Sequence, residues 1–158
     1  MSRGKKGQGK PVTPEMIAAP GTEHAHQAGF IVWQRMAKRV PGWELLDLLF
    51  AVPNGGERNP IVAGRMKAEG ARKGVWDICW AVNWHGVPGL WIEMKDPKYR
   101  NHAHGGLTEE QVDFGKAYFA LGWRMAVCYT WQEARDAVLA HYGANADPCP
   151  TQQTELPL

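Results

Sequence analysis

LWIEMKD, residues 90–96, is predicted to form a buried β-strand that carries two charged side chains. Its first three residues are apolar, as the interior of a sheet requires, but Glu93 and Lys95 follow two positions apart. Residues two apart in a strand point to the same face of the sheet. We therefore expect a carboxylate and an ammonium group to project together from a mostly apolar strand.

VWDICWAV, residues 75–82, repeats this pattern, because Asp77 interrupts another apolar run. An isolated buried carboxylate is costly and needs a partner or a metal ion. The intervening residues 83–89 are typical of a hairpin connection. If the hairpin turns near His85, opposed residues have numbers that sum to about 170. Asp77 then faces Glu93, on the same side as Lys95. The other face should be core and should contain Trp76, Ile78, Trp80, Ile92 and Met94.

Two carboxylates this close repel each other, and a divalent cation would remove the repulsion. Oxygen ligands suit Mg²⁺ or Mn²⁺ rather than zinc. Such an ion would make water more acidic and stabilise charge on a phosphoryl oxygen. Lys95 would then orient or deprotonate the water, or stabilise the developing negative charge. The alternative is a buried Asp–Glu–Lys network that only stabilises the core, and the spacing alone does not distinguish the two.

The whole chain predicts an α/β domain with a small mixed β-sheet flanked by helices, in the order αβαββαβα. Residues 1–20 are expected to be a disordered basic tail, residues 21–143 the folded domain, and residues 144–158 a flexible tail. The expected strands are 45–52, 75–82, 90–96 and 123–130, and the expected helices start near residues 22, 59, 108 and 131.

The composition of the 158 residues suits one globular domain with a real core, since 44% of them are hydrophobic. The net charge of +2 is modest, but a second basic cluster lies between residues 58 and 73, after the basic first ten residues. Such clusters can follow phosphates, although a solvated surface has the same composition. The three cysteines lack CxxC spacing, which argues against a disulfide framework or zinc site. No apolar stretch suits a membrane span or secretory signal, so a cytoplasmic protein without a membrane partner is expected.

Several motifs follow one another along the chain, namely VPNGGERNP (52–60), a basic helix, ARKGVWD (71–77), LWIEMK (90–95), LTEEQ (107–111) and GWRMAVCYTWQEA (122–134). In this order they resemble the VRR-type nuclease domain, a branch of the PD-(D/E)xK nucleases. The resemblance covers roughly residues 23–142. It implies a restriction-endonuclease-like core with a metal-dependent phosphodiesterase site.

The resemblance implies that Asp77, Glu93 and the Met94 backbone carbonyl are metal ligands, and that Lys95 is the catalytic lysine. Glu23 would be a further acidic ligand from the first helix, although an acidic residue at a helix N-terminus is favourable in any case. Gln111 would be a glutamine of the site. Its alternative role is in a capping box with Thr108, and the two roles compete for one side chain. The residues expected near substrate phosphate are Asn54, Gly55, Gly56, Arg58 and Lys73.

Trp76 departs from the family pattern, which has proline or a small residue before the metal-binding aspartate. The activity that the resemblance implies is that of a Mg²⁺-dependent DNA endonuclease, with Mn²⁺ as a substitute, that leaves 5′-phosphate and 3′-hydroxyl ends. Branched or flapped DNA in repair and recombination is the expected substrate, in a bacterial or phage-infected cell, and a homodimer would supply two cuts. The alternatives are a non-catalytic nucleic-acid-binding module of the same fold and a core ion pair in an unrelated protein.

Overall fold

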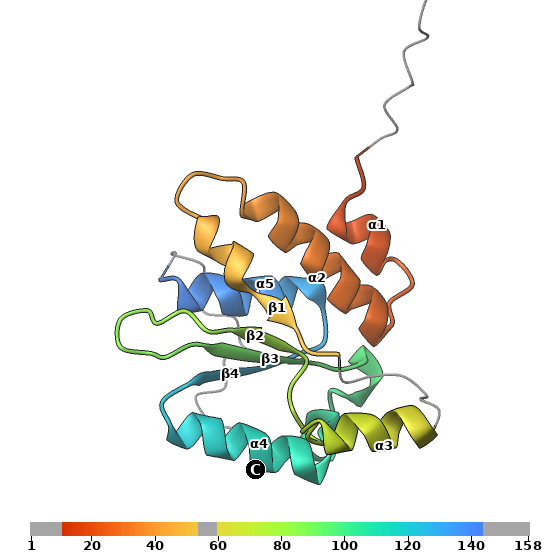
Figure 1. Cartoon of the computed structure of the whole chain (residues 1–158). Helices are drawn as coiled ribbons and strands as arrows, with labels where there is room; N and C mark the ends of the chain where they lie inside the picture. Colours follow the sequence, from red (N-terminus) through yellow and green to blue (C-terminus); the bar gives the residue numbers. More distant parts are fainter. Residues whose placement is uncertain (1–10, 54–59, 144–158) are drawn as a thin grey trace, which may run out of the picture.

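The computed structural model describes residues 11–53 and 60–143, and a small mixed sheet lies at the centre of this part of the chain (Figure 1). Within the described residues the sheet has four strands in the order β1-β2-β3-β4. β1–β2 and β2–β3 are antiparallel pairs, whereas β3–β4 is parallel. The strands are β1 (Phe50–Ala51), β2 (Ile78–Trp80), β3 (Leu90–Met94) and β4 (Arg124–Cys128).

The predicted hairpin register is confirmed. Ile78 pairs with Ile92 and Trp80 with Leu90, so the residue numbers of each pair sum to 170. The connection turns at His85 and Gly86, whose φ angles of 49° and 85° are both positive. Positive φ at two central residues gives a turn whose twist matches that of the flanking strands. β2 is shorter than the predicted strand 75–82, so Asp77 lies just before its first residue.

Four longer helices alternate with these strands in the predicted order, αβαββαβα. α2 and α5 lie on one face of the sheet and α4 lies on the other (Figure 1). Three of these helices start at a threonine whose hydroxyl accepts a backbone N–H. No helix in residues 11–53 and 60–143 is long and apolar enough to cross a membrane. The helices are α2 (Glu23–Ala37), α3 (Pro60–Ala68), α4 (Glu109–Ala120) and α5 (Trp131–His141).

Two predictions near the N-terminus are wrong. Of the expected disordered tail, residues 1–20, the described part includes the helix α1 (Pro14–Ala18), which packs on α2. Residues 1–10 and the expected flexible tail, residues 144–158, lie outside the described residues, so those predictions stay predictions. The expected strand 45–52 is mainly the 3₁₀ helix η1 (Glu44–Leu48), followed by the two residues of β1. Leu46 and Leu49 are buried, whereas Leu45 and Leu48 are exposed. A spacing of three between buried residues suits a helical turn, whereas a strand would bury alternate residues.

The core consists of two apolar clusters, one on each face of the sheet. Ile78, Trp80, Ile92 and Met94 lie in the cluster beneath α2 and α5, as predicted. Trp76 was predicted on the same face, but it lies in the cluster beneath α4. The alternation of a strand does not extend to Trp76, because β2 begins only at Ile78.

Candidate active site

Asp77 and Glu93 meet where the main-chain pairing of the β2–β3 hairpin ends. The Asp77 backbone N–H donates to Glu93 Oε2 at 3.2 Å, and the Met94 backbone N–H donates to Asp77 Oδ2 at 2.9 Å. Each carboxylate thus accepts a backbone N–H from the opposite side of the hairpin. The opposition of Asp77 and Glu93 predicted from the register is confirmed.

Glu93 is the centre of the cluster and is only 1% exposed. Its Oε1 atom lies 2.8 Å from Lys95 Nζ, and the Lys95 side chain is itself 12% exposed. The same Oε1 atom accepts a hydrogen bond from Gln111 Nε2. Glu93 is therefore oriented by an ammonium group, an amide and the Asp77 backbone N–H, which come from three parts of the chain.

Gln111 closes the predicted capping box and also contacts Glu93, a predicted site residue. Its side-chain oxygen accepts the Thr108 backbone N–H at 3.0 Å, and Thr108 Oγ1 accepts the Gln111 backbone N–H at 3.3 Å. These two bonds form the capping box of α4. Its side-chain NH₂ group remains available as a donor and binds Glu93. The prediction of competition was wrong, because an amide has an acceptor and donors on separate atoms.

The pKa of Glu93 is raised to about 8, chiefly by burial and then by the neighbouring Asp77, while Lys95 acts in the opposite direction. Burial also raises the pKa of Asp77, against the effects of the Met94 N–H and Lys95. For Lys95, burial alone would lower the pKa, but Glu93, Glu23 and Asp77 together raise it above its ordinary value. The ammonium group is thus held in its charged form, and the two carboxylates resist ionisation.

Glu23 adds a third carboxylate beside this cluster. Its Oε2 atom accepts the Asp96 backbone N–H at 3.1 Å, which joins the first turn of α2 to the end of β3. Its charge acts on Asp77, Glu93 and Lys95. Three carboxylates against one ammonium group leave the site with an excess of negative charge when all are ionised. A bound cation would neutralise this excess.

The donor set of Asp77 and Glu93 fits a hard divalent cation. Both side chains offer oxygen atoms, and the Met94 carbonyl lies on the Asp77 side of β3, because the N–H and C=O of one strand residue point to the same neighbour. Within the described ranges, no group of three or more His, Cys, Asp or Glu side chains is arranged to hold a metal ion. Mg²⁺ suits two carboxylates, because it retains several waters and needs few protein ligands.

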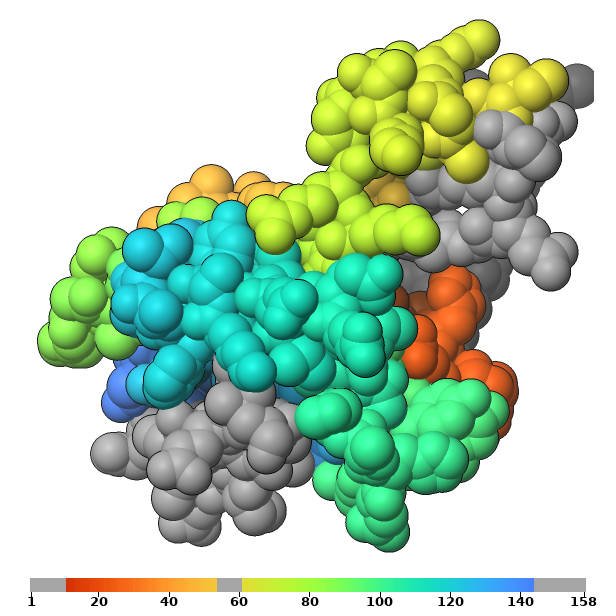
Figure 2. All heavy atoms as spheres, turned by 90° about the horizontal axis from the view of Figure 1, so that it is seen from below, coloured from red at the N-terminus to blue at the C-terminus, as the bar shows by residue number. Residues whose placement is uncertain are grey.

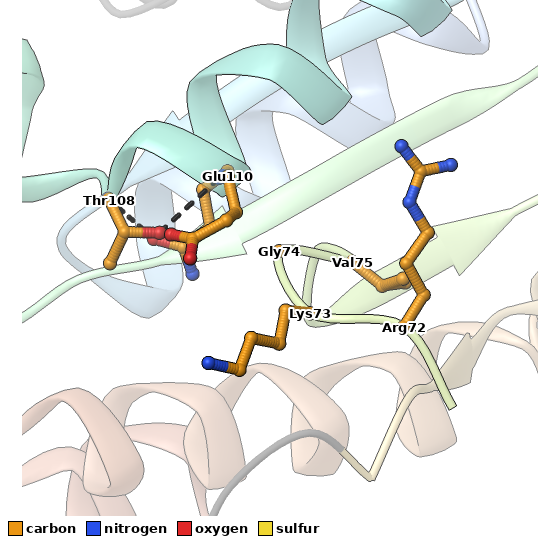
Figure 3. A pocket seen from close by; sticks show the side chains of 7 residues that line it. Arg72, Lys73, Gly74, Val75, Thr108 and Glu110 are labelled. Carbon is orange, nitrogen blue, oxygen red and sulfur yellow. Dashed lines mark hydrogen bonds between the residues drawn. The ribbon is translucent and has the colours of Figure 1, made fainter. Parts of the chain in front are cut away.

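A hollow of about 340 Å³ borders the cluster on the side of α4. It lies between residues 72–75 and the first turn of α4, and Gln111 lines it. Figure 3 shows Lys73 extending toward Thr108 and Glu110, while Arg72 leaves the loop in another direction. Lys73, predicted near substrate phosphate, therefore lies beside a space that opens next to the Glu93 partner Gln111.

Two residues that were not predicted to belong to the site, Gly74 and Trp76, fix the position of the loop that lines this hollow. Gly74 has φ +77°, and a Cβ atom there would lie 2.4 Å from the Glu110 carbonyl oxygen. The Trp76 indole N–H donates to the Gln111 carbonyl oxygen at 2.9 Å. The loop before Asp77 is thus packed directly on the first turn of α4. A glycine three residues before Asp77 was the available signal, because glycine readily adopts positive φ.

The loop that follows Lys95 is held by contacts with Tyr129 and Glu133. It contains the short 3₁₀ helices η2 (Pro97–Tyr99) and η3 (Ala103–Gly106). Arg100 forms an ion pair with Glu133, and the Tyr129 hydroxyl donates to the Gly105 carbonyl at 2.9 Å. These contacts hold the loop that follows Lys95 against residues 129 and 133.

The remaining predicted residues, Asn54, Gly55, Gly56 and Arg58, lie outside the described part of the chain, so their role stays a prediction. Comparison of the chain with protein-family models, curated proteins and solved structures found no match. The case for a function therefore rests on the geometry and chemistry of the cluster around Glu93.

Proposed function

We propose that this chain is a metal-dependent phosphodiesterase that cuts DNA, with a restriction-endonuclease-like core of the VRR type. The observation that carries the proposal is the meeting of Asp77, Glu93 and Lys95 at the open end of one hairpin. A buried carboxylate and a half-buried one, both with raised pKa values and both beside a charged lysine, are typical of a functional site. The mixed sheet with helices on both faces is compatible with such a core.

Under this proposal Asp77, Glu93 and the Met94 carbonyl hold Mg²⁺ or Mn²⁺. When bound, the ion would supply a more acidic water and positive charge beside the phosphoryl group. Lys95 stabilises negative charge on the phosphoryl oxygens, because its raised pKa keeps it protonated. Gln111 holds Glu93 in one orientation through its N–H group. Lys73, beside the hollow, binds a neighbouring phosphate of the strand.

Branched or flapped DNA is the substrate that we propose, as the resemblance to the VRR-type nucleases implies. The cut leaves 5′-phosphate and 3′-hydroxyl ends. The chain carries exposed cations near the site in Lys73 and Arg72, which suit a polyanionic substrate.

A cleavage panel tests the proposal. It consists of a four-way junction, a flap, a splayed arm, a single strand and a plain duplex, each with Mg²⁺ or Mn²⁺, together with the small diester bis(p-nitrophenyl) phosphate. We expect wild type to cut at least one DNA substrate and Glu93→Gln to cut none. Lys95→Met should lose activity while it still binds the metal. Equal cleavage by wild type and Glu93→Gln would show that the activity does not come from this site.

A non-catalytic nucleic-acid-binding domain of the same fold is the second candidate. One observation favours it: the Glu93 carboxylate already has partners in Lys95, Gln111 and the Asp77 N–H, so the network is satisfied by protein groups. Titration with Mn²⁺ separates the two candidates. Binding of Mn²⁺ that Asp77→Asn abolishes, together with cleavage, supports the nuclease. Nucleic-acid binding without cleavage of any substrate in the panel supports the second candidate.

A further inference from the structure

α3 packs less against the rest of the described fold than the other long helices do. Of residues 61–68, Met66 alone is partly buried and the others are exposed, with Ile61 at 73%. Figure 2 shows α3, in yellow, projecting from the rest of the molecule. Isolated helices shorter than about 12–15 residues are marginal in water, and packing stabilises most short helices in proteins. Residues 61–68 of α3 thus bury little of their surface, apart from Met66.

The side chains of α3 are arranged by size and charge around its axis. Successive residues are about 100° apart, so Arg65 and Lys67 lie to either side of Met66, which faces the body. Gly64 and Ala68 are each about 160° from Met66, and Ile61 is about 140° from it. The outward face is thus apolar, with small residues at Gly64 and Ala68 and the larger Ile61 at its N-terminal end, and a cation flanks it on each side. A Cβ atom added at Gly64 would meet nothing within 4 Å.

The positive charge continues from α3 toward the candidate active site. Residues 60–75 contain four cations and one acidic residue, Glu69, which gives a net charge of 4 − 1 = +3. All four cations are exposed. The cations after the helix, Arg72 and Lys73, line the hollow beside Gln111. A polyanion lying along α3 would therefore be led to the cluster around Glu93.

We propose that α3 lies in the major groove of duplex DNA and that Arg65 and Lys67 bind phosphates of the two opposite strands. The major groove is about 12 Å wide and admits one α-helix, and a small outward face allows a deep approach. Ile61, Gly64 and Ala68 offer no side-chain hydrogen-bonding group, so this contact is independent of base sequence. The inference deepens the proposed function and rests on it, since it names a duplex arm as the part of the branched substrate that the chain holds.

The test uses the full chain with Arg65→Gln/Lys67→Gln, and Arg39→Gln as the matched control. Arg39 is exposed and follows α2, whose C-terminal end lies far from α3 (Figure 1). Binding of a labelled duplex and of a single strand of the same sequence is measured against salt concentration. Each lost phosphate contact lowers the salt slope by about 0.9 on duplex DNA. We expect the double variant to lose about 1.8 in slope and at least tenfold in duplex affinity, and the control to match wild type.

Two further readouts make the outcome decisive. Wild type should protect guanine N7, which lies in the major groove, from methylation by dimethyl sulfate, and the double variant should not. Hydrolysis of bis(p-nitrophenyl) phosphate should be the same in both, because this small diester has no duplex arm that α3 could hold. Unchanged duplex affinity, or equal losses for duplex and single strand, would overturn the inference. A third outcome is that wild type binds duplex DNA through α3 but hydrolyses neither DNA nor bis(p-nitrophenyl) phosphate. That outcome would overturn the proposed function, whereas the inference that α3 binds duplex DNA would stand.

Discussion

Gln111 donates its side-chain N–H to the Glu93 carboxylate while its side-chain oxygen closes the capping box at the start of α4. One amide thus joins the local geometry of a helix terminus to the charge at the end of β3. The two residues are eighteen positions apart, and each belongs to a different element. A shift of the α4 N-terminus would therefore move the Gln111 N–H group that binds the Glu93 carboxylate.

Gln111→Glu should destabilise the protein more than Thr108→Ala does. A glutamate can still close a capping box, but it places a carboxylate against Glu93 where an N–H donor was. Thr108→Ala removes only the cap, at a cost of about 1 kcal/mol in the free energy of unfolding. Urea denaturation of both variants at pH 9, above the Glu93 pKa of about 8, measures this difference. A smaller loss for Gln111→Glu than for Thr108→Ala would show that the bond to Glu93 is unimportant.

Without added metal, the free energy of unfolding should fall as the pH rises from about 4.5 to above 8, through the contribution of Glu93. Burial raises the pKa of this carboxyl from 4.5 to about 8, so the folded state keeps a proton that the unfolded state releases. The contribution is fully present below the ordinary pKa and is lost as the pH passes the raised one. Glu93→Gln cannot ionise, so its free energy of unfolding should not fall in this pH range. The difference between the ordinary and the raised pKa of Glu93 limits the fall in wild type to about 5 kcal/mol. Parallel pH dependences of stability for wild type and Glu93→Gln would contradict this assignment.

Mg²⁺ or Mn²⁺ should stabilise the protein more at pH 8 than at pH 5.5. The metal needs ionised Asp77 and Glu93, whose pKa values are raised by burial, so its binding releases protons. The thermal midpoint is measured with increasing Mn²⁺ at both pH values, and the shift gives the affinity. Asp77→Asn is the control and should show little shift at either pH. A shift that is larger at pH 5.5 would place the bound ion elsewhere on the molecule.

Gly74→Ala should be far more damaging than Gly70→Ala, although both glycines have positive φ. A Cβ at position 74 would lie 2.4 Å from the Glu110 backbone oxygen, whereas a Cβ at position 70 meets nothing within 4 Å. We expect a loss of roughly 1 kcal/mol at position 70 from backbone strain, and roughly 3 kcal/mol or more at position 74. Chemical denaturation compares the two, and similar losses would mean that the close approach of this loop to α4 does not matter for stability.

The candidate site was predictable from sequence to the extent that it lies on one hairpin. Asp77 and Glu93 are sixteen residues apart, and the alternation of apolar residues with the turn at His85 was enough to bring them face to face. The side-chain period of a strand is two, so a slip of one residue would have turned the apolar set away from the core. Lys95 followed from the same alternation.

The sequence by itself thus determined the order of the four longer helices and the four strands, the register of the β2–β3 hairpin and the convergence of Asp77, Glu93 and Lys95, because each depends on a local period or on a single turn. Only the tertiary structure decided the second role of Gln111, the face on which Trp76 is buried and the raised pKa of Glu93. Each of these depends on how α4 packs against the end of the sheet. That packing is set by contacts between elements distant in sequence, which no local period encodes.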